Sequence, residues 1–424
     1  MTKKGFSEAD ILLPASGTDM AKWAVIACDQ YTSEPEYWKQ VEEIVSDQPS
    51  TLRIMLPECY LESEKKKELI ESIDKTMEDY LEKGLFTEYK DSYILVERTT
   101  ENGTRYGLVG KLDLEEYDFS PDSVSLIRAT EGTILSRIPP RIEIRKDAVL
   151  ELPHIVVLIS DEERSVIEPL IGKKAELEKV YDTDLMLRGG HIKGYLVSSS
   201  ADKEGIEEAL DRLYEKADKA NPLVFAMGDG NHSLATAKTL WEERKKGLSE
   251  EEKATDPARW ALVEIENIYD EGLQFEPIHR VLFGLSQKTF ESLLSSFADF
   301  EKEGVEDLSQ LEEKVNEAPG RFGLYDGAFV LYKLSNTAKA LPAWTIQAVI
   351  DKMLKEGLGA VDYIHGADTS VSLAGNGNLA IILPDISKET FFASILSDKA
   401  FPRKTFSIGH ANEKRYYLEA RRIR

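Results

Sequence analysis

The sequence predicts a mixed α/β fold, with α/β and α+β layouts both open, built from two or three domains. Short runs of strand character alternate with long amphipathic segments of helical spacing. Domains usually have about 150 residues, so a chain of 424 residues is too long for a single hydrophobic core. With 42% hydrophobic and 31% charged residues, the composition is that of a folded protein rather than a disordered chain.

The N-terminal region predicts two strands and a long helix. Residues 23–28 form a continuous apolar run of strand length, and residues 52–56 alternate in polarity before Pro57 ends the run. Residues 62–83 carry a stripe of apolar side chains at helical spacing, and Gly84 follows as a C-terminal cap. We therefore expect strands at the first two segments and a helix at the third.

A hairpin is expected next. Residues 93–97 and 106–112 flank Asn102-Gly103, a dipeptide suited to turns that need a positive φ. A Lys-, Glu- and Asp-rich stretch at 245–257 predicts a solvated connection, and a boundary is expected near 284–288. Further strands are expected at 155–160 and 194–198, and helices at 204–217, 233–246 and 308–317.

Composition and charge narrow the classes of partner. The 53 basic and 77 acidic side chains give a formal net charge of −24, which argues against nucleic-acid binding. The basic cluster at 415–424 is interleaved with acidic residues and is expected to be a paired surface segment. No run approaches the ~18 apolar residues that span a bilayer. Residues 1–8 also lack a signal-peptide core, so we expect a cytoplasmic protein with no membrane partner.

Cysteine and histidine usage argues against a disulfide framework and a zinc site. The two cysteines, Cys28 and Cys59, have no partner at metal-ligand spacing, and Cys28 is expected to be a buried, inert thiol. The six histidines show no ligand spacing either, so no resident metal is expected. A Gly-x-Ser-x-Gly nucleophile motif does not occur.

The most informative segment is Gly228-Asp229-Gly230-Asn231-His232-Ser233, hereafter the 228–233 box. The apolar run 222–227 predicts a buried strand before it, and an amphipathic helix follows. Glycines at a strand-to-helix turn let an anion approach the unpaired N–H groups of the helix start. The alternative is simple helix capping by Asp229, Asn231 or Ser233, with His232 as polar surface. The box is not a Walker loop, since no Gly-Lys-Ser/Thr follows.

Five segments are informative as a set: Ala27–Ser33, Ile127–Gly132, Gly228–Ser233, Asn267–Asp270 and Phe275–Arg280. Together they resemble a widespread bacterial family, domain of unknown function 1015, over about residues 9–422. The family has no settled activity, but the Asp-Gly-x-His pattern of its box is similar to that of the ParB and sulfiredoxin superfamily, which includes free-serine kinases. The resemblance implies a ParB/sulfiredoxin-like core in which Asp229, Gly230 and His232 line a nucleotide-phosphate pocket. The commoner pattern has histidine at Asn231 and arginine at Ser233, so a bidentate phosphate clamp is missing.

Residues 128–137 are the expected substitute for that clamp. Arg128 and Arg137 have the chemistry to contact phosphates, with Thr130 beside them and Glu131 as a base or Mg²⁺ ligand. The alternative is a surface salt-bridge cluster. Asp29–Thr32, which follow an expected strand, and His279-Arg280 are weaker candidates, for which capping and structural roles are comparably good explanations.

We therefore divide the chain into an N-terminal α/β region (1–115), a core with the phosphate-binding box (116–285) and a C-terminal α+β region (286–424). The function expected is phosphoryl transfer from ATP or ADP with Mg²⁺ to a small hydroxylated metabolite such as free serine. A non-enzymatic nucleotide sensor, a metal-dependent hydrolase and a purely structural protein remain alternatives, and the oligomeric state is left open. The expected catalytic residues are Glu131, Asp229 and His232, and the expected ligand contacts are Arg128, Thr130, Arg137, Gly228, Gly230, Asn231 and Ser233.

Overall fold

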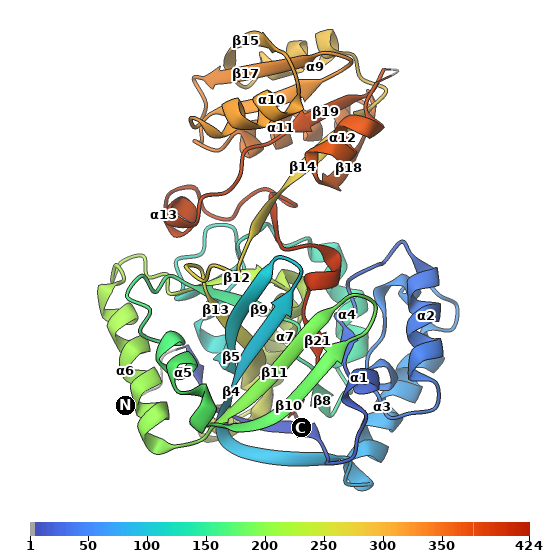
Figure 1. Ribbon diagram of the computed structural model, residues 1–424, viewed down its shortest axis with the longest axis vertical. Coiled ribbons are helices and arrows are strands. Elements are labelled where there is room, and N and C mark those ends of the chain that lie inside the picture. The colour runs from blue at the N-terminus through green and yellow to red at the C-terminus, as the bar shows by residue number, and fades with distance from the viewer. Residues whose placement is uncertain (1–4, 376) are drawn as a thin grey trace. The chain divides into compact units, whose positions relative to one another are not determined.

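The computed structural model describes residues 5–375 and 377–424, and it confirms the predicted mixed α/β fold (Figure 1). Residues 1–8 were expected to lack a signal peptide, and the first four of them lie outside the described residues. The chain forms two compact units. Unit 1 comprises Met1–Leu273 and Ala411–Arg424, and unit 2 comprises Gln274–His410.

Unit 1 is organised by one large mixed sheet. Among the described residues it has eleven strands in the order β10-β11-β4-β5-β13-β9-β12-β7-β6, with β1 beside β5 and β2 beside β4. The strands are β1 (Phe6–Ser7), β2 (Ala9–Pro14), β4 (Phe86–Thr100), β5 (Gly103–Asp113), β6 (Tyr117–Asp118), β7 (Ile127–Arg128), β9 (Val156–Ile159), β10 (Glu178–Leu185), β11 (Gly190–Val197), β12 (Phe225–Asp229) and β13 (Trp260–Asn267).

The end of the chain adds two small pairings to unit 1. β3 (Val25–Ile26) pairs with β21 (Tyr416–Tyr417), and β8 (Leu150–Glu151) pairs with β22 (Arg421–Arg422). The helices of unit 1 are α1 (Met20–Trp23), α2 (Pro35–Val45), α3 (Lys66–Glu82), α4 (Ile138–Arg145), α5 (Glu168–Gly172), α6 (Ser200–Lys216), α7 (Asn231–Arg244) and α8 (Glu250–Thr255).

Around the buried part of β4, both faces of the large sheet are covered, and successive side chains of the strand point to opposite faces. On β4, Tyr93 and Leu95 pack in the core that α6 and α7 cover. Ile94 and Val96 pack in a second core, which contains side chains of α2 and of the C-terminal segment. α7 follows β12, an interior strand that is third from the β6 edge of this sheet.

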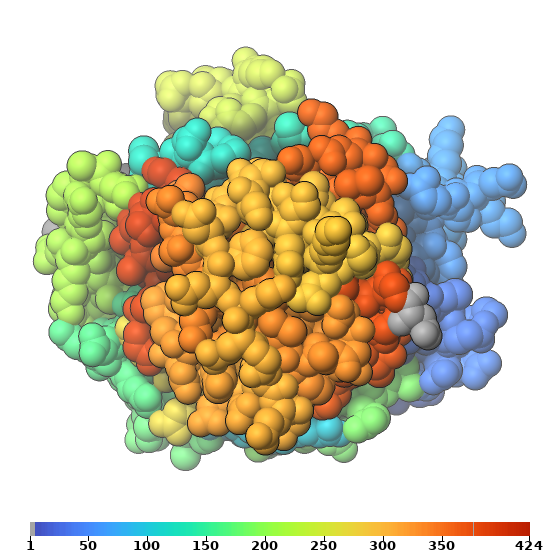
Figure 2. All heavy atoms as spheres, turned by 90° about the horizontal axis from the view of Figure 1, so that it is seen from above, coloured from blue at the N-terminus to red at the C-terminus, as the bar shows by residue number. Residues whose placement is uncertain are grey.

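Unit 2 is a smaller α/β unit. Its sheet has seven strands among the described residues, in the order β15-β17-β16-β19-β14-β18, with β20 beside β14. Figure 2 shows a face of this unit on which the gold and orange segments lie side by side. The elements are β14 (Phe275–Phe283), α9 (Gln287–Leu294), β15 (Asp299–Val305), α10 (Leu308–Asn316), β16 (Arg321–Tyr325), β17 (Phe329–Ser335), α11 (Pro342–Lys355), β18 (Ala360–His365), α12 (Ala367–Leu373), β19 (Leu379–Ile382), α13 (Lys388–Asp398) and β20 (Phe406–Ile408).

Most strongly periodic segments have the predicted structure. The helix expected at 62–83 is α3, and the hairpin around Asn102-Gly103 is the antiparallel pair β4–β5. The strand expected at 52–56 is wrong, since a 3-10 helix (η1, Thr51–Ile54) occupies most of it. Its cause is local, because the Ser50 hydroxyl accepts from the Leu52 N–H and caps the turn.

Other differences arise from side-chain capping and tertiary pairing. The expected strand 23–28 is shortened to β3, because Asp19 caps α1 immediately before it. The expected connection at 245–257 contains the short helix α8. Ser249 caps the start of this helix in a capping box. The basic C-terminal segment is paired as expected but is not surface, since Arg415 and Arg421 are 4% and 5% exposed.

The regions drawn from the sequence map onto the two units as follows. The boundary at 115/116 lies inside unit 1, between β5 and β6, and the boundary at 285/286 lies shortly after the start of unit 2. Within the described ranges, no helix has the length and apolar character that crossing a membrane requires.

Candidate functional site

The 228–233 box is a strand-to-helix turn whose helix start is not capped by a side chain. β12 ends at Asp229, Gly230 takes the left-handed conformation at φ 80°, and α7 begins at Asn231. The N-cap residue is Gly230, which has no side chain to cap this start, and Asp229 Oδ1 accepts from the Gly230 N–H. The first N–H groups of α7 therefore form a partial positive charge suited to an anion.

Glycine is required at position 230 for two reasons. Its positive φ strains any residue with a Cβ. A Cβ there would also lie 3.0 Å from Ile155 Cγ1 and 3.1 Å from Ile155 Cα. The close approach of the turn to the neighbouring backbone thus fixes where α7 begins.

The structure brings part of the second predicted segment against the box. Asn231 Oδ1 accepts from the Thr130 N–H at 3.2 Å, and the Thr130 hydroxyl donates to the Met227 carbonyl at 2.7 Å. His232 Nε2 accepts from the Ile134 N–H at 3.2 Å. Because a protonated Nε2 cannot accept, this bond requires the neutral ring, so His232 holds the loop rather than presenting a positive charge.

The other residues of that segment are placed differently. Glu131 is half-buried in the same loop, and Arg137 is exposed at the end of the 3-10 helix η4 (Leu135–Arg137). Arg128 is buried, and its guanidinium donates to three oxygens that precede β7 and β12: Ser125 O, Asn221 Oδ1 and Pro222 O. It is therefore tied to the opposite end of β12 from the box. These bonds go to neutral groups, which also does not fit a surface salt-bridge cluster.

Lys414 is a site residue that the sequence analysis missed. Its ammonium lies 3.1 Å from Asp229 Oδ2, and the two side chains are 10% and 28% exposed. Asp229 Oδ1 also accepts from the Gly230 N–H at 2.8 Å. Burial opposes ionisation of Asp229, but Lys414 and the Gly230 N–H outweigh it and lower the pKa of the carboxyl. The site thus contains a carboxylate and a cation side by side.

His154 and Tyr417 form a second set of contacts that no sequence pattern indicated. Ser233 Oγ lies 2.8 Å from His154 Nε2, and the Tyr417 hydroxyl lies 2.9 Å from His154 Nδ1. The Cys28 N–H donates to the Tyr417 oxygen at 3.2 Å. Desolvation raises the pKa of the Cys28 thiol far above its usual range, although the residue as a whole is half-buried rather than fully buried as expected.

An ion pair lies near these residues. Arg141 of α4 pairs with Glu58 of the 3-10 helix η2 (Glu58–Tyr60), and each side chain is 13% exposed. The Glu58 N–H donates to the Cys28 carbonyl at 2.8 Å. Burial raises the pKa of Glu58, which the paired Arg141 partly offsets. Glu58 also interacts electrostatically with His154, so the ion pair lies close to the His154–Tyr417 contacts.

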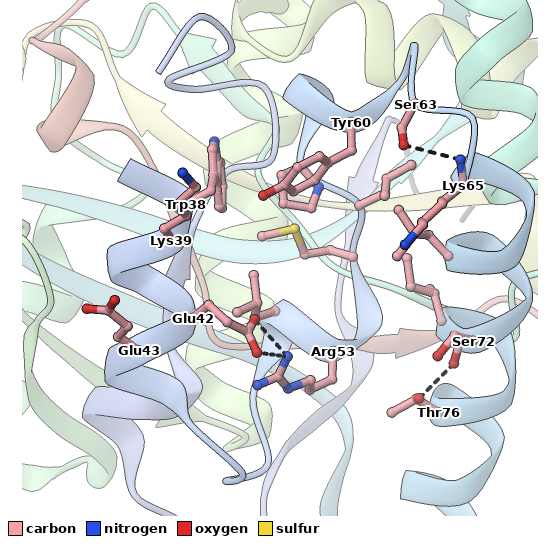
Figure 3. A pocket seen from close by; sticks show the side chains of 16 residues that line it. Trp38, Lys39, Glu42, Glu43, Arg53, Tyr60, Ser63, Lys65, Ser72 and Thr76 are labelled. Atoms are coloured by element: carbon pink, nitrogen blue, oxygen red, sulfur yellow. Dashed lines mark hydrogen bonds and ion pairs between the residues drawn. The ribbon is translucent and has the colours of Figure 1, made fainter. Parts of the chain in front are cut away.

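A pocket of about 660 Å³ lies elsewhere in unit 1, between α2 and α3 (Figure 3). None of the sequence-predicted site residues lines it, and its walls are mostly apolar. The Arg53 and Glu42 side chains at its edge are paired with each other. The lining residues are Trp38, Lys39, Glu42, Glu43, Leu52, Arg53, Met55, Leu56, Pro57, Tyr60, Ser63, Lys65, Leu69, Ser72, Ile73 and Thr76.

The described side chains do not assemble a metal-binding cluster of their own: no three His, Cys, Asp or Glu residues gather suitably in residues 5–375 and 377–424. Both carboxylate oxygens of Asp229 are already in contact, one with Lys414 and one with Gly230. Asp229 alone would therefore supply few of the ligands of a Mg²⁺ ion, which usually keeps several waters or takes phosphate oxygens.

The two weaker candidates of the sequence analysis, Asp29–Thr32 and His279-Arg280, belong to different units. Asp29 contributes to the electrostatics of Glu58 and Asp29–Thr32 lie in the loop after β3. His279 is buried in unit 2, where its Nδ1 accepts from the Leu383 N–H at 3.1 Å. Burial lowers the pKa of His279 to about 4, with the nearby Arg280 adding to the effect. His279 is thus a neutral core residue.

Comparison with known proteins gives one sequence match and several distant structural ones. A family model described as "Protein of unknown function (DUF1015)" matches residues 12–353. No curated protein matches the sequence.

The solved structures that resemble the chain have low sequence identity to it and low TM-scores. A conserved hypothetical protein from Pyrococcus furiosus is 12% identical with a TM-score of 0.36, over 73% of this chain and 90% of that one. A free serine kinase in complex with AMP is 11% identical with a TM-score of 0.39, over 73% and 90%. SbnI with C-terminal truncation from Staphylococcus aureus is 10% identical with a TM-score of 0.38, over 71% and 82%. Scores this low do not establish a shared function.

Proposed function

The chain belongs to the family described as protein of unknown function DUF1015, and from that premise and the geometry of its helix start we propose that it binds nucleotide phosphates at the 228–233 box. The observation that carries the proposal is the uncapped start of α7 behind Gly230. An uncapped helix start that leaves a buried sheet combines oriented N–H donors with a glycine that admits an anion to the backbone.

The cation that a phosphate needs is supplied by Lys414. Its ammonium is already at the box, held by Asp229. A bound phosphate would share Lys414 with Asp229, and the carboxylate would then gain freedom to accept a proton or to contact a metal-bound water. Lys414 acts as a point charge, so it replaces the charge of the missing arginine clamp but not its bidentate geometry.

The loop 130–137 forms the other wall of the proposed site. Thr130 and Ile134 are bound to Asn231 and His232, so ligand binding at the box and the conformation of this loop are coupled. Glu131 and Arg137 lie on the same loop, half-buried and exposed respectively. We assign them to the bound state, where Arg137 contacts phosphate and Glu131 contacts Mg²⁺ or a substrate hydroxyl. Arg128 is assigned a structural role.

The finer proposal is a kinase of a small hydroxylated metabolite such as free serine, with ATP or ADP and Mg²⁺. Asp229 or Glu131 would accept the hydroxyl proton, and the start of α7 and Lys414 would stabilise charge on the transferred phosphoryl group. The second candidate is a nucleotide sensor without turnover. The contact between the box and the loop 130–137 favours it, because a loop bonded to the ligand site is suited to report occupancy.

Thermal unfolding of the full chain with ATP, ADP, GTP or CTP, each with and without Mg²⁺, tests the proposal. A ligand at about 100 times its Kd adds about 2.7 kcal/mol of stability. We expect Tm to rise with at least one nucleotide and the rise to be lost in Asp229→Ala. No rise with any nucleotide would refute nucleotide binding. Release of AMP or ADP during incubation with serine then separates the kinase from the sensor.

A further inference from the structure

We propose that the pocket between α2 and α3 binds a small amphipathic carboxylate, with the apolar body of the ligand inside the pocket and its carboxylate against the ammonium of Lys65 (Figure 3). The pocket contains no residue of the 228–233 box, so this inference goes beyond the proposed function. Its volume of about 660 Å³ lies within the range of about 300–1,000 Å³ that is usual for small-molecule sites.

The pocket exists because its two helices pack into different hydrophobic cores. α2 buries Trp38 and Val41 in one cluster, whereas α3 buries Ile73 and Met77 in another. The segment 52–57 connects the two clusters and also lines the pocket. The space between the helices is therefore bordered by apolar side chains on both sides, which suits the apolar body of a ligand.

The segment 52–57 is held in place from its start, independently of a ligand. The Ser50 hydroxyl donates to the Lys22 carbonyl at 2.7 Å, and the Thr51 hydroxyl donates to the Trp23 carbonyl at 2.8 Å. The Tyr80 hydroxyl accepts from the Ser50 N–H at 3.1 Å, which ties the segment to α3. A pocket that is already formed costs a ligand little ordering free energy.

Most charged groups at the edge of the pocket are already engaged. One guanidinium nitrogen of Arg53 lies 2.7 and 2.8 Å from the two carboxylate oxygens of Glu42. The Lys39 ammonium pairs with Glu36 at 2.6 Å. The carboxylate of Glu43 points away from the pocket (Figure 3). None of these groups therefore sets the charge that the pocket prefers in a ligand.

Lys65 sets that preference. Its ammonium points into the pocket (Figure 3), and this ammonium forms no hydrogen bond or ion pair with the part of the chain that the structure describes. An anionic head group would gain Coulomb energy here, whereas a second ammonium would be repelled. The net charge of −24 does not prevent this, because salt screens charges more than about 10 Å away.

Methyl NMR of the full chain, labelled at its seven methionines, reports on the pocket through Met55. Titrations with octanoate, 1-octanol and octylamine compare three head groups on one apolar body. We expect the Met55 resonance, assigned with Met55→Leu, to shift most readily with octanoate. Octanoate should bind about fivefold more tightly than 1-octanol, and octylamine should bind more weakly than both. Hexanoate should lose about fourfold in affinity for each missing CH₂.

Two variants with matched controls place the ligand. Lys65→Gln should lower octanoate affinity about fivefold, to that of 1-octanol, and leave 1-octanol binding unchanged. Its control is Lys67→Gln, which removes the same charge from an exposed lysine outside the pocket. Ser72→Phe places a ring in the pocket and should abolish the binding of both compounds. Its control is Glu78→Phe, at an exposed position of α3 outside the pocket.

The contrary outcomes are distinct. Absence of a Met55 shift with octanoate, or equal affinity for octanoate and 1-octanol, would overturn the inference. An equal loss of octanoate affinity in Lys65→Gln and Lys67→Gln would show that the carboxylate does not contact Lys65, which also overturns it. Asp229→Ala should bind octanoate like the wild type, so failure of nucleotide binding at the box leaves this inference standing, and its own failure leaves the box unaffected.

Discussion

The ammonium of Lys414 lies 3.1 Å from the carboxylate of Asp229. This ion pair joins the end of β12 to the C-terminal segment of the chain. Both side chains are less than one-third exposed, so the pair is shielded from solvent more than a surface ion pair is. Replacing one partner leaves the other as a partly buried, uncompensated charge. The pair therefore links stability and the proposed ligand site.

Lys414→Ala is expected to lower the free energy of unfolding by about 1–2 kcal/mol and to weaken ADP binding. Urea denaturation and calorimetry measure the two effects. The control is Lys246→Ala, which removes an exposed lysine paired with Glu243 on the same unit. If Lys414→Ala behaves like this control in both measurements, Lys414 is not part of the site.

Glu266 gives the protein a pH-dependent stability. Its side chain is 1% exposed, and burial raises its pKa to about 7, although Arg105 Nε lies 3.1 Å from Oε1. The unfolded chain loses this proton near the ordinary glutamate pKa of about 4.3, whereas the folded chain holds it to about pH 7. The folded state therefore binds more protons in this window, and the free energy of unfolding falls as pH rises through it.

Glu266→Gln is expected to remove this contribution. The difference in unfolding free energy between the wild type and the variant, measured in urea at pH 5, 6, 7 and 8, should shift against the wild type as pH rises and level off above about pH 7. Glu271→Gln is the control, since that side chain is 90% exposed. A wild-type-to-Gln difference that is constant over this range would show that Glu266 ionises normally.

His232 is expected to hold the loop 130–137 rather than to carry charge. In His232→Ala the Ile134 N–H loses its acceptor, so its hydrogen exchange should accelerate, while amides in α6 keep their protection. Exchange followed by mass spectrometry of the peptide that contains Ile134 measures this. Unchanged exchange at Ile134 would mean that the loop is held by Thr130 and Asn231 alone.

Local patterns in the sequence were sufficient where one segment carries its own signal. The apolar stripe of 62–83 and the Asn102-Gly103 turn predicted α3 and the β4–β5 hairpin. The alternating run 52–56 failed, because a hydroxyl cap at Ser50 outweighed a short pattern. Short runs carry too few residues for periodicity to decide between strand and turn.

The site was predictable only in part, for a related reason. The 228–233 box and the Thr130 loop carry composition that indicates ligand chemistry, and the structure brings them together. Lys414, Tyr417 and His154 carry no such signal, since each reaches the box through strand pairing between distant parts of the chain, as in β3–β21. Arg128 shows the opposite case. Its guanidinium is chemically suited to bind phosphate, but it forms hydrogen bonds with the loops before β7 and β12 instead.

The central claim is that the start of α7 binds phosphate, and calorimetric titration of ADP and adenosine into the wild type and Gly230→Ala tests it most directly. Gly230→Ala strains a positive φ and brings a Cβ to 3.0 Å from Ile155, at a cost of about 1–2 kcal/mol. Gly205→Ala in α6, where a Cβ meets nothing within 4 Å, is the control and should stabilise the chain by about 0.5–1 kcal/mol.

We expect the wild type and Gly205→Ala to bind ADP far more tightly than adenosine, because the phosphates make the contacts with the helix start. This preference should be lost in Gly230→Ala at a temperature where that variant is folded. Equal affinity of the wild type for ADP and adenosine, or full retention of the preference in Gly230→Ala, would contradict the account.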